Sequence, residues 1–243
     1  MLTRQHITKE STLADIECEN DEYSNSISAC ADAAFLERLP LALSYTASLT
    51  HGDHAVLIFD NLVVAAEYFC AHINEGINKQ ELTCVIGLPR WRYQKLFEQV
   101  GVKVAQLENC GYLRHFSLQD FYLADGHPNK NKAQRNIENL LSTTKSSICG
   151  GVRFINIQEP PSASGRSFQE LIDFEKWLGT LSSYPISMVC CYDARALLES
   201  PFSTHFTELL KVHEHCAFQG IAMPTNTLLG SRVGVAYPKL RSQ

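Results

Sequence analysis

Short apolar runs alternate with longer amphipathic segments over most of this chain. The run 185–193 (PISMVCCYD) has almost no polar face, which is typical of a strand covered on both sides in a parallel sheet. The segments 168–181 and 204–213 flank it and carry apolar residues at helical spacing. A helix, a buried strand and a second helix in succession predict a doubly wound α/β sheet organised around 185–193.

The same alternation predicts the remaining elements. Further strands are expected at residues 55–59, 82–87, 102–107, 152–157 and 218–223, and helices at 61–78, 90–100 and 132–145. Asn61 is a candidate N-cap for the first of these helices. We expect residues 111–121, before the turn at 125–128, to form an edge strand or a lid, and residues 231–243 a short strand and tail. One three-layer α/β domain over residues 46–243, with a mostly parallel sheet flanked by helices, accounts for this order.

Residues 1–45 differ from the rest of the chain. They hold an acidic cluster followed by a segment, 28–38, that could form a helix; the acidic residues are Asp15, Glu17, Glu19, Asp21 and Glu22. We expect an acidic, loosely attached N-terminal arm whose charge is a solvated face.

Composition and charge exclude several classes of protein. The formal net charge is −5, and the sequence has no basic stripe of the kind that binds nucleic acid directly, so such binding is not predicted. No apolar run approaches the roughly 20 residues that a membrane helix needs, and the first ten residues lack a signal-peptide core. A cytoplasmic protein without membrane contact is therefore expected. The nine cysteines are expected to be buried, reduced thiols, because their number is odd, the chain is not small and several lie in or beside predicted strands. No C-x-x-C pair occurs, so neither a zinc ribbon nor a thioredoxin-type redox pair is predicted.

Nucleotide chemistry has no support at the first strand–helix junction. A phosphate-binding loop there needs glycines and a lysine, but residues 59–63 read FDNLV, and Asp60 would repel phosphate. The motifs G-x-G-x-x-G and G-x-S-x-G are also missing. No enzymatic reaction and no cofactor are predicted.

Ligands of doubly wound sheets bind beyond the carboxyl ends of the strands. Carboxylates fall at three predicted strand ends, although such residues are often only solvated or capping groups. Arg153 lies inside an apolar strand, so it is either exposed at an edge or paired with a carboxylate such as Glu159 or Glu175. The residues that we predict to bind a ligand are Asp60, Tyr122, Arg153, Glu159, Glu175, Tyr192 and Asp193.

Two histidine motifs suggest metal ligands only weakly. His51 and His54 form one, and residues 213–216 (HEHC) form the other. Neither motif has a matching distant cluster that would complete four ligands, so no metal is predicted. His213 is interpreted as a helix C-terminal residue favoured by the dipole. Cys190 and Cys191 are adjacent on a strand and should pack on opposite faces.

The order of several motifs resembles the sensory domain called MEDS, which occurs in methanogen and methylotroph regulators such as the dichloromethane-responsive repressor. The motifs are Gly52-Asp53-His54, residues 116–126, Val152-Arg153 with Glu159, Phe174-Glu175, Cys191-Tyr192-Asp193, and His213. The resemblance implies a relative of the RecA and KaiC ATPases without a phosphate loop. It also implies sensing of small organic molecules beside a helix-turn-helix, a histidine kinase or another signalling module. These 243 residues leave no room for a kinase or a convincing DNA-binding domain, so the output is expected to pass to a separate protein.

The leading hypothesis is a stand-alone sensor or adaptor. It would bind a small organic molecule over the strand ends, near Tyr122, Glu159, Tyr192 and Asp193, and relay to a separate histidine kinase or response regulator. The alternatives are a ligand-free interaction module that regulates such a partner, a residual nucleotide-binding protein or enzyme, and a thiol or metal sensor. A homodimer is the assembly expected if the chain self-associates.

Overall fold

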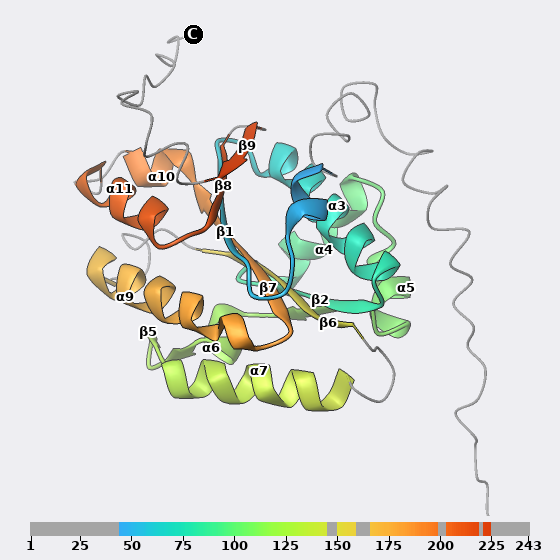
Figure 1. Ribbon diagram of the computed structural model, residues 1–243. Helices are drawn as coiled ribbons and strands as arrows, with labels where there is room; N and C mark the ends of the chain where they lie inside the picture. Colours follow the sequence, from blue (N-terminus) through green and yellow to red (C-terminus); the bar gives the residue numbers. More distant parts are fainter. Residues whose placement is uncertain (1–43, 145–149, 159–165, 199–202, 219–220, 225–243) are drawn as a thin grey trace, which may run out of the picture.

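A seven-stranded sheet lies between two layers of helices (Figure 1) in the computed structural model of the chain, which describes residues 44–144, 150–158, 166–198, 203–218 and 221–224. The strand order is β3-β2-β6-β7-β1-β8-β9. The first six strands in this order pair in parallel, and β9 pairs with β8 in the antiparallel sense. The strands are β1 His54–Phe59, β2 Glu81–Ile86, β3 Leu113–Phe116, β6 Gly151–Ile157, β7 Ile186–Asp193, β8 His215–Phe218 and β9 Ile221–Pro224. The predicted α/β class, with a mostly parallel sheet flanked by helices, is confirmed.

Strand β7 occupies the middle of the sheet, as its apolar sequence predicts. It pairs with β1 on one side and β6 on the other, so that Met188 lies beside His54 and Phe154. Seven of its eight residues are buried. Its adjacent cysteines point to opposite faces, since Cys190 packs in one apolar layer and Cys191 in the other.

Each face of the sheet is covered by its own set of helices. One face carries α3 (Leu62–Asn78), α4 (Arg90–Gln99) and α5 (Val104–Asn109), together with helical residues 44–48. The other carries α6 (Leu118–Phe121), α7 (Lys130–Thr144), α9 (Phe168–Gly179), α10 (Ala194–Leu198) and α11 (Ser203–Lys211). A 3-10 turn, Thr180–Ser183, joins α9 to β7, and a hairpin of β4 (Leu123–Ala124) and β5 (His127–Pro128) precedes α7.

Local sequence explains where the long helices begin. The side chain of Asn61 accepts a hydrogen bond from the Val63 amide at 2.9 Å, so the predicted N-cap of α3 is confirmed. Helix α9 starts with a capping box, in which the Ser167 hydroxyl accepts from the Glu170 amide and the Glu170 carboxylate accepts from the Ser167 amide. This cap fixes the start of the helix that carries Glu175.

Two of the strand predictions are wrong. Residues 102–107 were expected to be a strand, but 104–109 form helix α5, whose Val104 and Leu107 are buried at a helical spacing of three. The strand beside β2 is β3, in the segment for which an edge strand or a lid was expected. The single strand expected over 218–223 is instead divided between β8 and β9. The helix at 28–38 and the strand at 231–243 lie outside the described residues.

Of the six cysteines that the structure describes, five follow the expectation. Five of them are free and buried: Cys70, Cys84, Cys190, Cys191 and Cys216. Cys110 is disulfide-bonded, so the expectation of reduced thiols is wrong at that position. No helix in the described part of the chain combines the length and apolarity needed to cross a bilayer.

Candidate functional site

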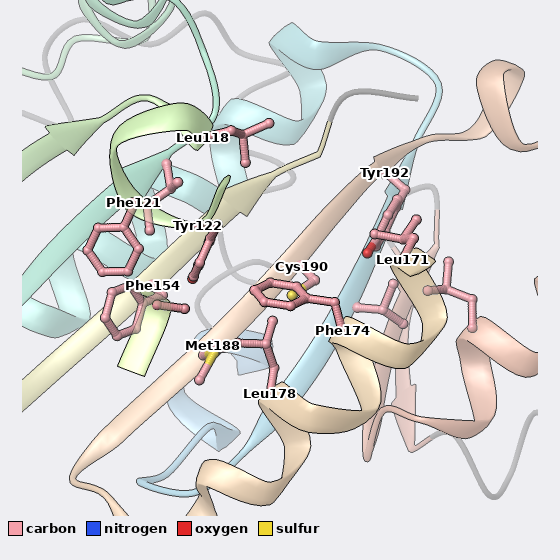
Figure 2. Close-up of a cluster of buried hydrophobic side chains, with 14 of the residues drawn as sticks. Leu118, Phe121, Tyr122, Phe154, Leu171, Phe174, Leu178, Met188, Cys190 and Tyr192 are labelled. Carbon is pink, nitrogen blue, oxygen red and sulfur yellow. The ribbon is translucent and has the colours of Figure 1, made fainter. Parts of the chain in front are cut away.

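Helix α9 buries a carboxylate in the apolar layer between itself and the sheet. Leu171, Phe174 and Leu178 of α9 face Met188 and Cys190 of β7 (Figure 2). Glu175 follows Phe174 in the sequence and is fully buried in the same layer. A buried carboxylate is costly unless it is paired and hydrogen-bonded, so its partners identify the polar centre of this layer.

Three side chains from different elements meet Glu175. Its Oε2 lies 3.0 Å from Nε2 of His54, the first residue of β1. The same oxygen lies 3.3 Å from Nε2 of His213, which follows α11. Its Oε1 accepts a hydrogen bond from the hydroxyl of Tyr192 on β7. All four side chains are buried, so the contacts are shielded from water.

A thiol joins this group and connects it to a further polar chain. Cys190 Sγ lies 3.4 Å from His54 Nε2 and accepts from Asn156 Nδ2 on β6 at 3.5 Å. Asn156 Oδ1 in turn accepts from the Tyr122 hydroxyl at 2.9 Å. We call His54, Glu175, Cys190 and His213 the α9 cluster; their donor atoms lie within 4.8 Å of one another.

Burial and charge act on the cluster in opposite directions. Burial alone would raise the pKa of Glu175, but hydrogen bonding and charge interaction with His213 and His54 outweigh it and hold that pKa below its usual value. Burial lowers the pKa of His54, and the neighbouring His213 lowers it further. Burial raises the pKa of the Cys190 thiol, as does the negative charge of Glu175. The cluster therefore favours an ionised carboxylate while disfavouring the protonated form of one of its histidines.

The tautomer of His213 is fixed by the helix before it. Its Nδ1 donates to the Leu209 carbonyl oxygen of α11 at 2.7 Å, so the interpretation of His213 as a helix C-terminal residue is confirmed. Its Nε2 lies 3.3 Å from Oε2 of Glu175. That atom is not aligned for a hydrogen bond with any described residue. The ring centroid of His213 lies 4.1 Å from that of His54.

The structure brings three of the predicted site residues into one network: Tyr122, Glu175 and Tyr192. Asp60 is exposed after β1, and Asp193 accepts from the Arg195 amide at 2.8 Å as a cap of α10. Glu159 lies outside the described residues. The network lies within the layer under α9, because Cys190 pairs in register with Val56 and Asn156, inside the strands rather than beyond their ends.

Arg153 lies on the opposite face of the sheet. It is 1% exposed, and its Nε donates to Glu81 Oε2. Its Nη1 lies 3.5 Å from His72 Nδ1 on α3, and the other Glu81 oxygen lies 2.6 Å from His51 Nε2. Of the two alternatives predicted for Arg153, exposure at an edge or pairing with a carboxylate, the structure shows the second. The partner is Glu81 rather than Glu175.

His54, Cys190 and His213 were not among the predicted site residues. The two histidine motifs were the available signal, and each was judged incomplete because its neighbours in sequence supply too few ligands. In the fold, His54 from one motif and His213 from the other lie together with Glu175 and Cys190. The two residues that complete the cluster therefore belong to neither motif.

Comparison with known proteins identifies the family. The profile described as MEDS, MEthanogen/methylotroph, DcmR Sensory domain, matches residues 53–214. The chain belongs to the MEDS family. All four residues of the α9 cluster fall within the matched part of this MEDS domain, and so do β1 through α11.

Other comparisons add little to this assignment. No curated protein matches the chain. Among solved structures, it is similar to the flagellar accessory protein FlaH from Methanocaldococcus jannaschii, with 10% sequence identity, a TM-score of 0.41 and coverage of 84% of this chain and 78% of that one. Similarity at this level decides nothing further, and the expected relationship of the MEDS domain to RecA and KaiC stays a prediction.

Proposed function

We propose that this MEDS domain binds a small organic molecule and relays its presence to a separate signalling protein, such as a histidine kinase or response regulator. Membership of a sensory domain family supports the sensory role. The observation that carries the ligand-binding part is the polar network under α9, which runs from Tyr122 through Asn156 and Cys190 to Glu175 and Tyr192.

The network is costly to the fold, and this favours a functional role. Its neighbours in the same layer are apolar, including Leu171, Phe174 and Met188. Replacing buried ion pairs by apolar side chains of similar volume is often neutral or stabilising. A set of buried polar groups that the layer does not need for packing is therefore a candidate for recognition of a ligand's polar group.

The same network offers a route from ligand to surface. Glu175 belongs to α9, whereas its partners belong to β1, β7 and the segment after α11. A ligand that competes for one of these contacts would change how firmly α9 is held on the sheet. The size of that change is limited by the ligand's difference in affinity for the two arrangements.

The junction of β1 and α3 supports an organic ligand rather than a nucleotide. Helix α3 begins at Leu62, directly after its Asn61 cap, and Asp60 is exposed between strand and helix. The connection between β1 and α3 is too short for a glycine-rich loop that wraps around phosphates. We therefore expect nucleotides to bind no better than unrelated anions.

Thermal-shift titration tests the proposal. Wild-type protein would be titrated with small alcohols, ketones, organic acids and nucleotides. We expect saturable stabilisation by one organic class, lost in Glu175→Gln, which keeps the shape of the side chain and removes its charge. The matched control Asp60→Asn alters an exposed carboxylate at a strand end and should keep the response.

Two results would count against the proposal. One is the absence of a response to every organic class in protein that is folded by circular dichroism. The other is a response that survives Glu175→Gln but disappears in Asp60→Asn, which would move the ligand to the strand ends.

A further inference from the structure

We propose that the α9 cluster binds one divalent transition-metal ion of the zinc class, through His54 Nε2, Glu175 Oε2, Cys190 Sγ and His213 Nε2. The inference deepens the proposed function and rests on it only for its consequence, in which the ion sets how firmly α9 is held on the sheet where an organic ligand acts. The ion itself can be present whether or not such a ligand binds.

The spacing of the donor atoms matches a tetrahedral site. Zinc bonds of about 2.0–2.3 Å at tetrahedral angles place neighbouring donors about 3.3–3.7 Å apart. Three of the six donor pairs measure 3.0 Å (His54 to Glu175), 3.3 Å (His213 to Glu175) and 3.4 Å (His54 to Cys190), and all six lie within 4.8 Å. The three measured pairs need to change by only a few tenths of an ångström to hold an ion at their centre, which is within small side-chain adjustments.

The donor types select the class of metal. Two imidazoles, one thiol and one carboxylate are the ligands that zinc and its neighbours bind. Calcium and magnesium require several oxygen ligands, and this cluster offers a single carboxylate. A thiolate and a carboxylate together balance the two positive charges of the ion. The loaded site is then neutral, which suits an apolar layer.

Each of three donors is held by an outer partner that orients it. The Leu209 carbonyl binds the Nδ1 proton of His213 at 2.7 Å and leaves Nε2 free to coordinate. The Tyr192 hydroxyl occupies the other oxygen of Glu175. Asn156 Nδ2 lies 3.5 Å from the Cys190 sulfur. Such partners commonly fix the tautomer and direction of metal ligands.

One donor atom of the cluster is buried without an aligned hydrogen-bond partner among the described residues. His213 Nε2 lies 3.3 Å from Oε2 of Glu175, whereas Nδ1 of the same ring donates to the Leu209 carbonyl. A metal ion between the two atoms would bond to both.

Four protein ligands in a buried space describe a closed site of the structural kind. The ligands come from β1, α9, β7 and the end of α11, elements that are distant in sequence. The ion would therefore tie α9 and the end of α11 to the centre of the sheet. Its removal should loosen α9 and lower the melting temperature.

Metal analysis and cobalt spectroscopy test the proposal on the full chain without a histidine tag. We expect about one zinc per chain by mass spectrometry of the purified protein, or uptake of one equivalent after treatment with a chelator. Cobalt(II) in the stripped protein should give the visible bands of tetrahedral coordination and a near-ultraviolet thiolate-to-cobalt band. Cys190→Ser should remove the thiolate band, whereas Cys84→Ser, a buried thiol on β2, should keep it.

A second variant separates a metal site from packing alone. Tyr192→Phe removes only the hydroxyl that orients Glu175 and should weaken metal binding about 10- to 100-fold. The proposal is overturned if folded wild-type protein takes up neither zinc nor cobalt, or if the thiolate band survives Cys190→Ser. The wild-type measurements hold even if a variant fails to fold.

Repeating the metabolite titration on stripped and loaded protein distinguishes the two proposals. A chain that holds zinc but responds to no organic compound upholds the metal site and overturns the sensor. A chain that responds to an organic compound but takes up no metal does the reverse.

Discussion

Arg153 is a fully buried cation whose charge is balanced from the neighbouring strand. Its β6 position pairs in register with Thr83 of β2, two residues from Glu81, and both side chains lie under α3 beside His72. His51 binds the second oxygen of Glu81. The group is a paired charge set on the sheet face opposite to the α9 cluster, and its role in the structure is stabilisation of this face.

Removing the charge of Glu81 should be strongly destabilising. Glu81→Gln leaves the Arg153 guanidinium buried without a counter-charge, which typically costs about 3–5 kcal/mol of unfolding free energy. Glu75→Gln is the matched control, because Glu75 pairs with Lys79 one helical turn away in a partly exposed contact worth about 0.5 kcal/mol or less. Urea denaturation measures both. Equal losses would show that Arg153 is not balanced by Glu81.

His72 should make the protein sensitive to mild acid. Burial lowers its pKa well below the ordinary value, and the charges of Arg153 and Lys79 lower it further. Below about pH 6.5 the unfolded chain takes up a proton that the folded chain refuses, so stability falls as pH falls. His54, whose pKa is also lowered, acts in the same direction.

The contribution of His72 can be measured by comparing variants. The unfolding free energy of the wild type should fall as the pH is lowered from about 7.5 to about 5.5. In His72→Gln this fall should be smaller, by on the order of 1 kcal/mol per pH unit. His127→Gln, which changes a largely exposed side chain, should keep the wild-type slope. An unchanged slope in His72→Gln would contradict the assignment.

At the scale of elements, the end of β2 depends on a single glycine. Gly87 has φ +116°, and a Cβ at this position would overlap the carbonyl oxygen of Ile157 at the end of β6. The neighbouring chain reaches this close only because no side chain is present. The close approach keeps the ends of β2 and β6 together at the carboxyl edge of the sheet.

Gly87→Ala should therefore destabilise the protein by about 3 kcal/mol or more, since it combines backbone strain with a backbone overlap. Gly126→Ala is the matched control. Gly126 also has positive φ, at +82°, but nothing lies within 4 Å of the added Cβ, so only the strain of about 1–2 kcal/mol remains. Thermal and urea unfolding compare the two. Similar losses would mean that the contact with Ile157 relaxes freely.

The elements that could be predicted from the sequence are those with a long, unambiguous pattern. Strand β7 is almost wholly apolar up to Asp193, and α9 has apolar residues at helical spacing, so both were predicted. The segment 102–107 alternates for a few residues in a way that fits strand or helix, and only packing decides. The site depended on contacts between distant segments: His54 and His213 meet because β1 and β8 are neighbours in the sheet, and strand order is not written in either motif.

At the scale of the whole molecule, the sheet separates two apolar layers that contain different chemistry. The layer between the sheet and α9, here called the α9 layer, contains the α9 cluster. The layer between the sheet and α3, the α3 layer, contains the Arg153 and Glu81 pair. The two tryptophans belong to helices α9 and α4, which lie on opposite sides of the sheet (Figure 1). Trp177 on α9 packs against Phe174 with ring centroids 5.3 Å apart, whereas Trp91 on α4 is 68% exposed.

This separation predicts which tryptophan reports events at Glu175. Trp177 lies two residues beyond Glu175 on the same helix, so zinc added to metal-stripped protein should change its fluorescence. We expect the change to persist in Trp91→Phe and to disappear in Trp177→Phe, with iodide quenching as the control that assigns the exposed emission to Trp91. A change that disappears in Trp91→Phe and persists in Trp177→Phe would place binding in the α3 layer. The fluorescence of two single-tryptophan variants thus distinguishes the two sides of the sheet, because Trp177 packs against Phe174 in the α9 layer and Trp91 is largely exposed on α4.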